Sequence, residues 1–276
     1  MDIKVISFNI LCGGPEGKYW TDRKDMVTSF LGSEHPDSFG VQEAHINWMN
    51  TLRAALPEYA FVGVGRDDGK EDGEFSPVFY LKDKYEVVDS GTFWLSETPD
   101  TPSYGWDAAC RRVCSYAKLR EKSTGCIYVH MNTHLDHRGQ AARVNGLQLV
   151  LDKAAEFAEP VVCTGDFNFE EGCDLYKQMT SGKLQDSKFA ADETMNSFTF
   201  NAFLPDIKKD DPPAIIDYIN ISRDIKAKKY SVCTDKPGGK FPSDHFPVIA
   251  ELTIRLLKQA ERRYLNVFFA QIPPFS

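Results

Sequence analysis

The sequence predicts an α/β fold, a four-layer sandwich of two stacked mixed β-sheets flanked by helices, with residues 1–254 forming a single domain. Two observations lead to this prediction. Of the 276 residues, 42% are hydrophobic, and a chain of this length is near the upper limit for one hydrophobic core. Short apolar runs typical of strands recur along the whole chain, and amphipathic helical segments lie between several of them.

The first part of the chain alternates between strand and helix patterns. Residues 3–10 alternate in polarity and predict a strand, whereas residues 23–31 carry apolar side chains at helical spacing. Residues 38–42 predict a second strand. Residues 46–56 predict a second helix that ends at Pro57, with Ile46, Met49, Leu52 and Leu56 on one face. The order of these elements favours an α/β fold.

The middle of the chain is rich in short strands. We predict them at residues 61–64, 78–81, 87–93, 113–119 and 126–133. The polar segment 66–74 contains glycine and separates the first two of these strands. Residues 96–109 form a long loop with two prolines, and loops of this length are often functional.

The last half of the chain completes the predicted sheets. Further strands are predicted at residues 161–164, 215–221, 230–233 and 246–254. An amphipathic helix is predicted at residues 143–157, and a helix or turn near residues 173–179. Residues 255–276 begin with a basic helical pattern, and we treat them as a C-terminal extension without an assigned role.

The chain is acidic, with 40 Asp and Glu residues against 32 Lys and Arg residues and a formal net charge of −8. A molecule with this balance repels polyphosphates unless a cation or a local basic patch intervenes. The charge therefore argues against general binding to nucleic acid. If the partner is a phosphoester, this balance suits a small molecule or a short nucleic acid better than a long polymer.

The cysteine pattern and the apolar runs bear on location. Seven scattered cysteines, an odd number, fit a reducing compartment better than a disulfide framework. Cys110 and Cys114 would share a face of a helix and could bind metal, although we prefer to interpret them as ordinary buried thiols. No apolar run reaches the roughly 20 residues of a membrane span. We expect a cytoplasmic monomer without stable membrane association, and a secretion signal removed from the chain would also fit.

Side chains that bind metals or transfer protons stand next to the predicted strands. They are Asn9, Glu43, His134, Asp166 with Asn168, Asp217, and Asp244 with His245. If the strands lie side by side, these residues meet at one rim of the sheets, where enzymes often place their sites. Taken alone, Asn9 is also typical of a strand end, and Glu43 of a helix N-terminus.

Two local motifs are more specific. In Thr-Gly-Asp166-Phe-Asn168, two polar side chains one residue apart on an extended segment face the same way, although an Asx turn is the alternative. In Ser-Asp244-His245-Phe-Pro, one group can bind metal while the other transfers a proton, although a strand-entry turn with an exposed His is the alternative. Asp217 lies in an apolar run and needs a partner, which His245 would provide.

The oxygen-rich side chains favour magnesium over zinc. Mg²⁺ takes oxygen ligands and is usually held by one or two carboxylates. Glu43, Asp166 and Asp244 supply such carboxylates, with the amides of Asn9 and Asn168 beside them, whereas zinc favours more His or Cys ligands. A divalent cation would also offset the clustered negative charge and admit an anionic phosphoester.

This ordered set of motifs is similar to that of the endonuclease/exonuclease/phosphatase superfamily, the deoxyribonuclease I-like metal-dependent phosphoesterases. The resemblance spans residues 1–254 and runs in order through the motifs named above. Residues 63–70, 73–77 and 93–99 are similar to a mainly bacterial subgroup of predicted hydrolases. The resemblance implies a deoxyribonuclease I-like fold and a divalent-metal-dependent phosphoester hydrolase, whether phosphodiesterase, nuclease or phosphatase.

The resemblance also implies how the metal is held. Glu43 matches the residue that binds Mg²⁺ or Mn²⁺, and Asn9 matches a residue that supports both this metal and the phosphate. Asp244 matches a second metal-associated carboxylate.

The catalytic roles follow from the same resemblance. Asp166 would orient or deprotonate the attacking water, with Asn168 beside it on the phosphate. His134 matches a phosphate-contacting histidine. His245 would pair with Asp217, contact the phosphate and act as general acid or base.

Two arginines are candidates for binding the substrate phosphate. Arg112 lies where relatives often carry a basic residue, although Arg111 beside it leaves the register open and a structural salt bridge is an alternative for either. Arg138 follows His134 closely enough to line the same cleft.

Two other functions compete with this interpretation. Residues 132–139 resemble the His-x-His-x-Asp-His-x-Gly signature of zinc metallo-β-lactamase-type hydrolases, but the first His of that signature is Asn132 here. That interpretation also leaves Asn9, Glu43 and Asp244 unexplained. The other alternative is a catalytically silent phosphate-binding module of the same fold, which typically loses the catalytic residues that this chain retains.

Overall fold

The computed structural model describes residues 1–13, 18–203 and 214–255, and in these two mixed β-sheets stack face to face. The first sheet has seven strands, in the order β10 (Glu193–Met195), β12 (Ile225–Val232), β13 (Val248–Ile254), β1 (Asp2–Asn9), β2 (Ser38–Gln42), β4 (Val78–Leu81) and β3 (Tyr59–Val62). The second has six, in the order β5 (Tyr85–Trp94), β6 (Val113–Glu121), β7 (Ile127–His134), β8 (Val161–Asp166), β11 (Asp217–Ser222) and β9 (Leu184–Asp186).

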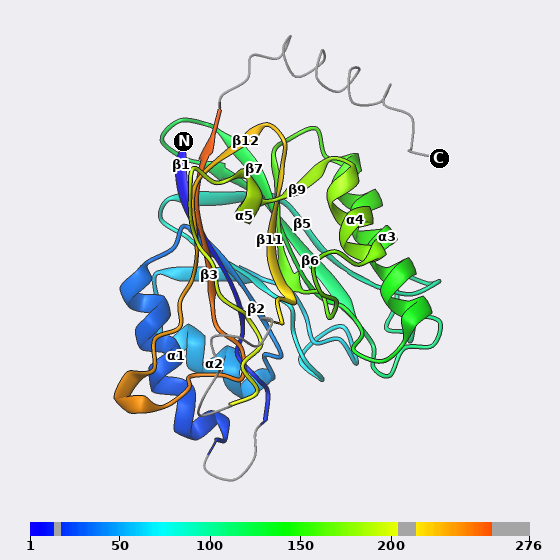
Figure 1. Cartoon of the computed structure of the whole chain (residues 1–276), viewed down its shortest axis with the longest axis horizontal. Helices are drawn as coiled ribbons and strands as arrows, with labels where there is room; N and C mark the ends of the chain where they lie inside the picture. Colours follow the sequence, from blue (N-terminus) through cyan, green and yellow to red (C-terminus); the bar gives the residue numbers. More distant parts are fainter. Residues whose placement is uncertain (14–17, 204–213, 256–276) are drawn as a thin grey trace.

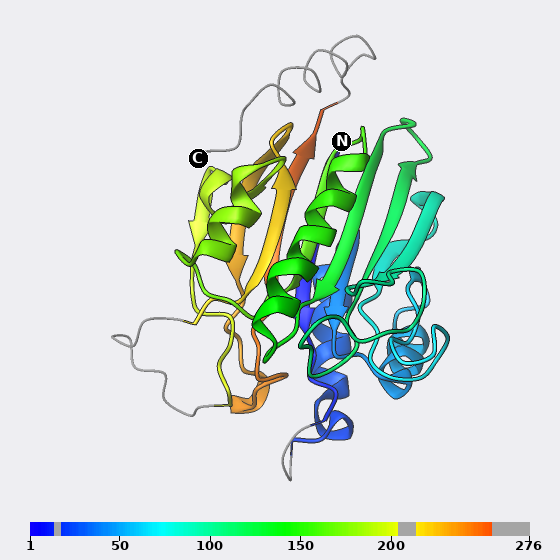
Figure 2. The same cartoon turned by 90° about the vertical axis from the view of Figure 1, so that its right-hand side faces the viewer.

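Helices cover the outer face of each sheet (Figure 1). The helices α1 (Trp20–Glu34) and α2 (Ile46–Ala55) bury apolar side chains against the first sheet. The helices α3 (Gln140–Glu156) and α4 (Asp174–Ser181) lie on the second sheet, in front of it in Figure 2. Two short elements, α5 (Ser187–Ala190) and a 3₁₀ helix (Pro237–Gly239), complete the described chain. The predicted four-layer α/β sandwich is confirmed.

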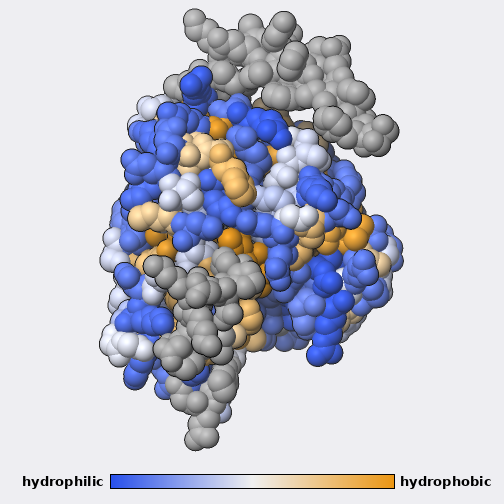
Figure 3. All heavy atoms as spheres, viewed as in Figure 1, coloured by the Kyte–Doolittle hydropathy of each residue, from blue (hydrophilic) through white to orange (hydrophobic). Residues whose placement is uncertain are grey.

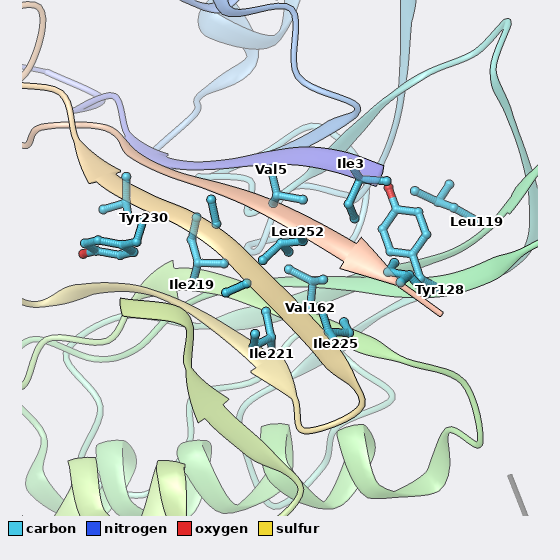
Figure 4. Packing of buried hydrophobic residues seen from close by; sticks show 14 of the residues in the cluster. Ile3, Val5, Leu119, Tyr128, Val162, Ile219, Ile221, Ile225, Tyr230 and Leu252 are labelled. Carbon is cyan, nitrogen blue, oxygen red and sulfur yellow. The ribbon is translucent and has the colours of Figure 1, made fainter. Parts of the chain in front are cut away.

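The largest apolar core lies between the two sheets (Figure 4). Val5 of β1 and Leu252 of β13 meet Val162 of β8 and Ile219 of β11, and each side chain is at most 1% exposed. Strand β13 alternates buried and half-buried residues along its length, as expected of a strand with one face in the core. The face of the molecule in Figure 3 is mostly hydrophilic with small scattered apolar patches.

A seam of buried hydrogen bonds joins the two sheets toward the end of strand β2. Gln42 Nε2 donates to Asn132 Oδ1 at 2.7 Å, and Thr164 Oγ1 donates to the same oxygen at 2.9 Å. Gly40 makes this close approach feasible, because a Cβ there would lie 2.4 Å from Asn132 Oδ1 and 2.4 Å from Thr164 Oγ1. The seam therefore fixes how the two sheets sit against each other.

Most predicted elements are confirmed, with boundaries that differ by a few residues. The prediction missed β9, α5, β10 and the 3₁₀ helix, which have three or four residues each and too few side chains to show a periodicity. Strand β12 begins at Ile225, five residues before the predicted start. Cys110 and Cys114 do not share a helix, because Cys114 lies in β6 and Cys110 in the preceding loop. The predicted C-terminal extension, from residue 256 on, lies outside the described residues.

In the part of the chain that the structure describes, no helix is long and apolar enough to span a membrane.

Replacing Gly40 by Ala should destabilise the protein, because the added methyl group forces the buried seam apart. We expect a loss of about 1–3 kcal/mol in the free energy of unfolding, measured by urea denaturation. Gly32→Ala is the matched control. Gly32 lies in helix α1, where alanine is favoured over glycine, and its added Cβ would only touch Leu56 Cδ2, at 3.4 Å. Equal stability of the two variants would contradict the role given to Gly40.

Candidate active site

The strand directions bring the predicted site residues to one edge of the two sheets. Strands β1 and β2 are parallel, so Asn9 pairs with Gln42 and Glu43 follows immediately. Strands β7 and β8 are also parallel and place His134 beside Asp166. Strand β11 runs antiparallel to β8, so its first residue, Asp217, pairs with Asp166, and β13 likewise begins shortly after His245.

Asn9 connects the two sheets at this edge. Its side chain is fully buried, and Nδ2 donates to Glu43 Oε1 at 2.9 Å and to Asp166 Oδ2 at 2.9 Å. Its Oδ1 accepts a hydrogen bond from the backbone N–H of Leu11 at 3.0 Å. The amide therefore turns its NH₂ group toward both carboxylates. Because its oxygen faces the backbone of Leu11, Asn9 is better placed to orient Glu43 than to bind a metal through that oxygen.

Two site residues adopt left-handed backbone conformations. Glu43 has φ 61° directly after β2, and Asn168 has φ 52° shortly after β8. This conformation costs a non-glycine residue about 1–2 kcal/mol. Such strain is often retained at functional sites, where hydrogen bonds offset it. The backbone N–H of Cys12 donates to Glu43 Oε2 at 3.1 Å and so helps to fix the Glu43 side chain.

The prediction that Asp166 to Asn168 form an extended segment is wrong, and the alternative, an Asx turn, is present. Strand β8 ends at Asp166, and the backbone N–H of Asn168 donates to Asp166 Oδ1 at 3.0 Å, which is the Asx turn. The Asn168 side chain donates from Nδ2 to the Leu135 carbonyl oxygen at 3.0 Å. The chain turns here because Asp166 satisfies the backbone group that a longer strand would pair.

His245 is buried between two aspartates. Its Nδ1 lies 2.8 Å from Asp217 Oδ2, and its Nε2 lies 3.7 Å from Asp166 Oδ2. Burial by itself lowers the pKa of the imidazole, but the negative charges of Asp217, Asp166 and Asp244 outweigh it and raise the pKa to about 10. His245 is therefore an imidazolium at neutral pH, and the predicted pairing with Asp217 is present.

The carboxylates of Glu43, Asp166 and Asp244 differ in how the protein stabilises their charge. Burial raises the pKa of Asp166 and of Asp244; the negative charges of Asp217 and Glu43 raise that of Asp166 further, and the charge of Glu43 raises that of Asp244. Glu43 itself is also disfavoured as an anion by burial, but hydrogen bonds from Asn9 and Cys12 outweigh burial and lower its pKa. Two of the three acids are thus poorly neutralised by their protein neighbours. An oxygen-rich acidic cluster of this kind fits a hard divalent cation.

A second group of possible ligands surrounds Asp166. Asp166, Asp217 and His245 each offer a ligand atom, and these atoms lie within 4.8 Å of one another. However, Asp217 and His245 already bind each other. We therefore expect Glu43 and Asp244 to hold a cation, with Asp166 and the intact Asp217–His245 pair beside it.

His134 approaches the site from the second sheet. Its Nε2 lies 3.4 Å from Asp166 Oδ2, and its Nδ1 is buried without a hydrogen-bond partner among the described residues. Burial and the positive charges of Arg112 and Arg66 lower its pKa well below the usual value. His134 is therefore neutral and can donate one hydrogen bond.

Arg112 is buried close to His134. Its Nη2 lies 3.1 Å from His137 Nδ1, and longer ion pairs of 3.7 and 3.9 Å connect it to Asp136 and Glu74. The guanidinium Nε and Nη1 have no hydrogen-bond partner among the described residues, and the residue is 5% exposed. Unpaired buried N–H groups of this kind can bind a phosphate. Asp136 does not act as a free acid here, since it accepts four backbone N–H groups.

The two neighbouring arginines in the sequence have different surroundings. Arg111 pairs with Asp67 at 3.2 Å and lies over the ring of Tyr104, so the register that assigns Arg112 to the site is the one that the geometry favours. Arg138 is exposed, and its backbone N–H donates to Asp136 Oδ1 at 2.9 Å.

Sequence reasoning missed two residues beside the site, Arg66 and Glu74. Arg66 Nη1 lies 2.5 Å from Glu74 Oε2, and Arg66 also influences the pKa of His134. The only sequence signal was the polar loop that contains them, and a loop gives no periodicity from which to infer a direction.

Comparison with known proteins places this fold and site in a class. The sequence model of the endonuclease/exonuclease/phosphatase family matches residues 6–245. The chain therefore belongs to this family, and it is a phosphoester hydrolase by class. The family match also excludes the zinc metallo-β-lactamase interpretation of residues 132–139. Asn132, at the position of the missing histidine, instead donates to the carbonyl oxygens of Val41 and Pro77.

Solved structures with the same fold include two from Bacteroides thetaiotaomicron. An endonuclease/exonuclease/phosphatase family protein is 37% identical, with a TM-score of 0.87 over 93% of this chain and 99% of that chain. A mannosyl-6-phosphatase is 37% identical, with a TM-score of 0.86 over 91% of this chain and 100% of that chain. D. rerio TDP2, at 18% identity and a TM-score of 0.72 over 91% of this chain and 99% of that chain, shares the fold. The predicted deoxyribonuclease I-like fold is confirmed.

The Asp217–His245 pair should make stability depend on pH. Because the folded pKa of His245 is raised from about 6.5 to about 10, its contribution is complete below pH ~6.5 and is lost as the pH rises toward 10. In EDTA-treated protein, the free energy of unfolding should therefore fall over this window, and Asp217→Asn should flatten the fall.

Urea denaturation at several pH values measures this effect. Asp192→Asn is the control, because Asp192 pairs with Lys226 at the exposed surface at 2.8 Å and should leave the slope unchanged. Identical slopes for the wild type and Asp217→Asn would show that the pair does not raise the pKa of His245.

Proposed function

We propose that the chain is a divalent-metal-dependent hydrolase of compact phosphoesters that uses Mg²⁺ or Mn²⁺. The observation that most directly supports this proposal is the contact of the Asn9 amide with both Glu43 and Asp166, with the protonated His245 at their side. This arrangement would supply a metal-binding carboxylate, a proton acceptor and a cation at one buried edge.

Glu43 and Asp244 would hold the metal, with Asn9 fixing the Glu43 carboxylate. A bound cation would lower the pKa of a water molecule and neutralise charge on the phosphoryl oxygens. The raised pKa values of Asp166 and Asp244 support this role, because a nearby cation would offset the burial and the repulsion between carboxylates that cause them.

The protein side chains would divide the remaining tasks. Asp166 would accept the proton of the attacking water; its Oδ1 accepts the backbone N–H of Asn168 and its Oδ2 accepts the amide of Asn9, and each oxygen has a further lone pair. His245 is already protonated, so it would stabilise the phosphoryl oxygens or donate its Nε2 proton to the leaving group, but it would not act as the base. His134 and Asn168 would contact the phosphate from the second sheet.

The arginines would complete phosphate binding. Arg112 has two nitrogens without hydrogen-bond partners among the described residues, and it lies beside His134. Arg138 would reach the substrate from the exposed loop after β7. Together they would supply the positive charge that the acidic chain otherwise lacks.

The substrate is best sought among small phosphomonoesters. The net charge of −8 opposes a tight grip on a long polyphosphate. In addition, the mannosyl-6-phosphatase of B. thetaiotaomicron is 37% identical over 91% of this chain. We therefore propose a phosphorylated sugar or a similar polyol as the substrate class, with a short nucleic acid as the alternative.

The proposed location and assembly are those expected from the sequence, a cytoplasmic monomer. All seven cysteines are free thiols, which supports a reducing compartment.

A substrate panel tests the function. With Mg²⁺ or Mn²⁺ present, we expect hydrolysis of phosphomonoesters, including 6-phosphomannosides, and slower hydrolysis of phosphodiesters and short oligonucleotides. Glu43→Ala and Asp166→Ala should each reduce kcat at least ~1,000-fold, because each removes a group that acts in the transition state. Release of inorganic phosphate measures the rates, and EDTA treatment should abolish them.

The same panel distinguishes the competing interpretations. Undiminished turnover by the Glu43→Ala protein would point to a contaminating phosphatase. Absence of turnover by a folded wild-type protein on every substrate would favour the catalytically silent module.

Arg112→Lys tests the proposed phosphate contact. Lysine keeps the charge but not the planar pair of donors, so we expect kcat/KM to fall about tenfold or more while the fold survives. Arg120→Lys is the control. Arg120 lies on β6, the strand that begins directly after Arg112, and it pairs with Glu86 at 2.8 Å on the surface. Equal kcat/KM values for the two variants would remove Arg112 from the site.

A further inference from the structure

Three side chains next to the active site form a cluster that the proposed hydrolysis does not use. The thiol of Cys12, the imidazole of His45 and the carboxylate of Glu74 each offer a ligand atom, and these atoms lie within 4.8 Å of one another. Cys12 follows β1, His45 is the N-cap residue of α2, and Glu74 comes from the loop before β4. Three segments that are distant in the sequence therefore bring three different donors to one point.

Hydrogen bonds fix the backbone that carries each of these side chains. The Trp48 indole donates to the carbonyl oxygen of Leu11 at 3.0 Å, which holds the segment before Cys12 against α2. The backbone N–H of Phe75 donates to the Ala44 carbonyl oxygen at 2.9 Å. Glu74, which precedes Phe75, and His45, which follows Ala44, are therefore held side by side. The backbone positions of the three donor residues are therefore fixed by the fold.

Arg66 orients the carboxylate of Glu74 by a hydrogen bond, and Arg112 lies at ion-pair distance from it. Arg66 Nη1 lies 2.5 Å from Oε2, and Arg112 Nη1 lies 3.9 Å from the same oxygen. Both contacts fall on Oε2, which leaves Oε1 for a cation. Carboxylates that bind metals are typically held by a hydrogen bond in this manner, which fixes their orientation before the metal arrives.

The donor set selects the kind of metal. Thiolate and imidazole favour Zn²⁺, whereas Mg²⁺ prefers oxygen ligands and has no use for a thiol. Ligand atoms within 4.8 Å of one another need only small side-chain movements to reach zinc–ligand bonds of about 2.0–2.3 Å. Three protein ligands would leave the fourth position of a tetrahedral zinc open to water.

We propose that Cys12, His45 and Glu74 form a zinc-binding site that adjoins the magnesium site. The two sites share a border at Glu43, whose Oε2 accepts the backbone N–H of Cys12 at 3.1 Å. They differ in their donors, so each takes its own class of cation. This proposal does not rest on the proposed function, because zinc binding at Cys12 requires no turnover.

Cobalt substitution tests the site directly. In the full-length protein, with Mg²⁺ in excess and a phosphine reductant to keep the thiols reduced, added Co²⁺ should produce a thiolate-to-cobalt charge-transfer band that saturates at one equivalent. Zn²⁺ should abolish the band and Mg²⁺ should not. Cys12→Ala should remove the band, and His45→Ala should weaken zinc binding at least ~100-fold.

Two variants locate the site. Cys110→Ala is the matched control, because Cys110 also lies within 4.8 Å of a carboxylate and an imidazole, those of Asp136 and His137. It should retain the band, as should Glu43→Gln, in which the ligand of the magnesium site is lost. Circular dichroism and thermal unfolding check that each variant is folded.

The outcomes are separable from those of the phosphatase assay. A wild-type protein without the band, a band that survives Cys12→Ala, or one that is lost in Cys110→Ala would overturn the zinc site, whatever the turnover. Loss of the band in Cys12→Ala alone supports it, even if every phosphoester in the panel proves inert.

Discussion

The structure depends on one buried carboxamide, that of Asn9, which holds the carboxylates of Glu43 and Asp166 at 2.9 Å each. Glu43 follows the first sheet and Asp166 ends a strand of the second, so this side chain connects the ends of both. An unpaired buried carboxylate is costly, and two side by side repel each other. The amide offsets this repulsion, and the seam from Gln42 to Asn132 keeps the sheets at the distance that it requires.

The electrostatics of the site explain how an acidic protein can bind a phosphoester. Burial and the negative charge of Glu43 disfavour the anionic forms of Asp166 and Asp244, while Asp217 favours the protonated form of His245 beside them. The site thus combines a cation that the chain supplies itself with acids that favour a metal cation. The net charge of −8 describes the whole surface, whereas the substrate meets the local charge at one edge of the sheets.

Periodicity and strand order were sufficient to predict the layered fold and the edge at which the polar residues meet, whereas the roles of these residues came from the family resemblance and stay predictions. Polar residues that end buried strands gather at one edge whenever the strands lie side by side, as Asn9 and Asp166 do. Loops carry no such rule, so the positions of Arg66 and Glu74 could not be inferred. The turn at Asn168 was only the second choice from the sequence for a related reason: the Asp166 side chain, rather than a neighbouring strand, satisfies the backbone there.

The two proposed cation sites meet at one residue, Cys12. Its backbone N–H donates to Glu43 Oε2 at 3.1 Å, and its thiol also hydrogen-bonds to the Glu43 side chain. The same thiol lies within 4.8 Å of ligand atoms of His45 and Glu74. A zinc ion would draw the thiolate to this second set while the backbone contact keeps its hold on Glu43, and each set would select its cation by ligand chemistry rather than by distance. A change of Cys12 to a residue without a thiol would keep the backbone contact to Glu43, while it removes the only sulfur of the second set.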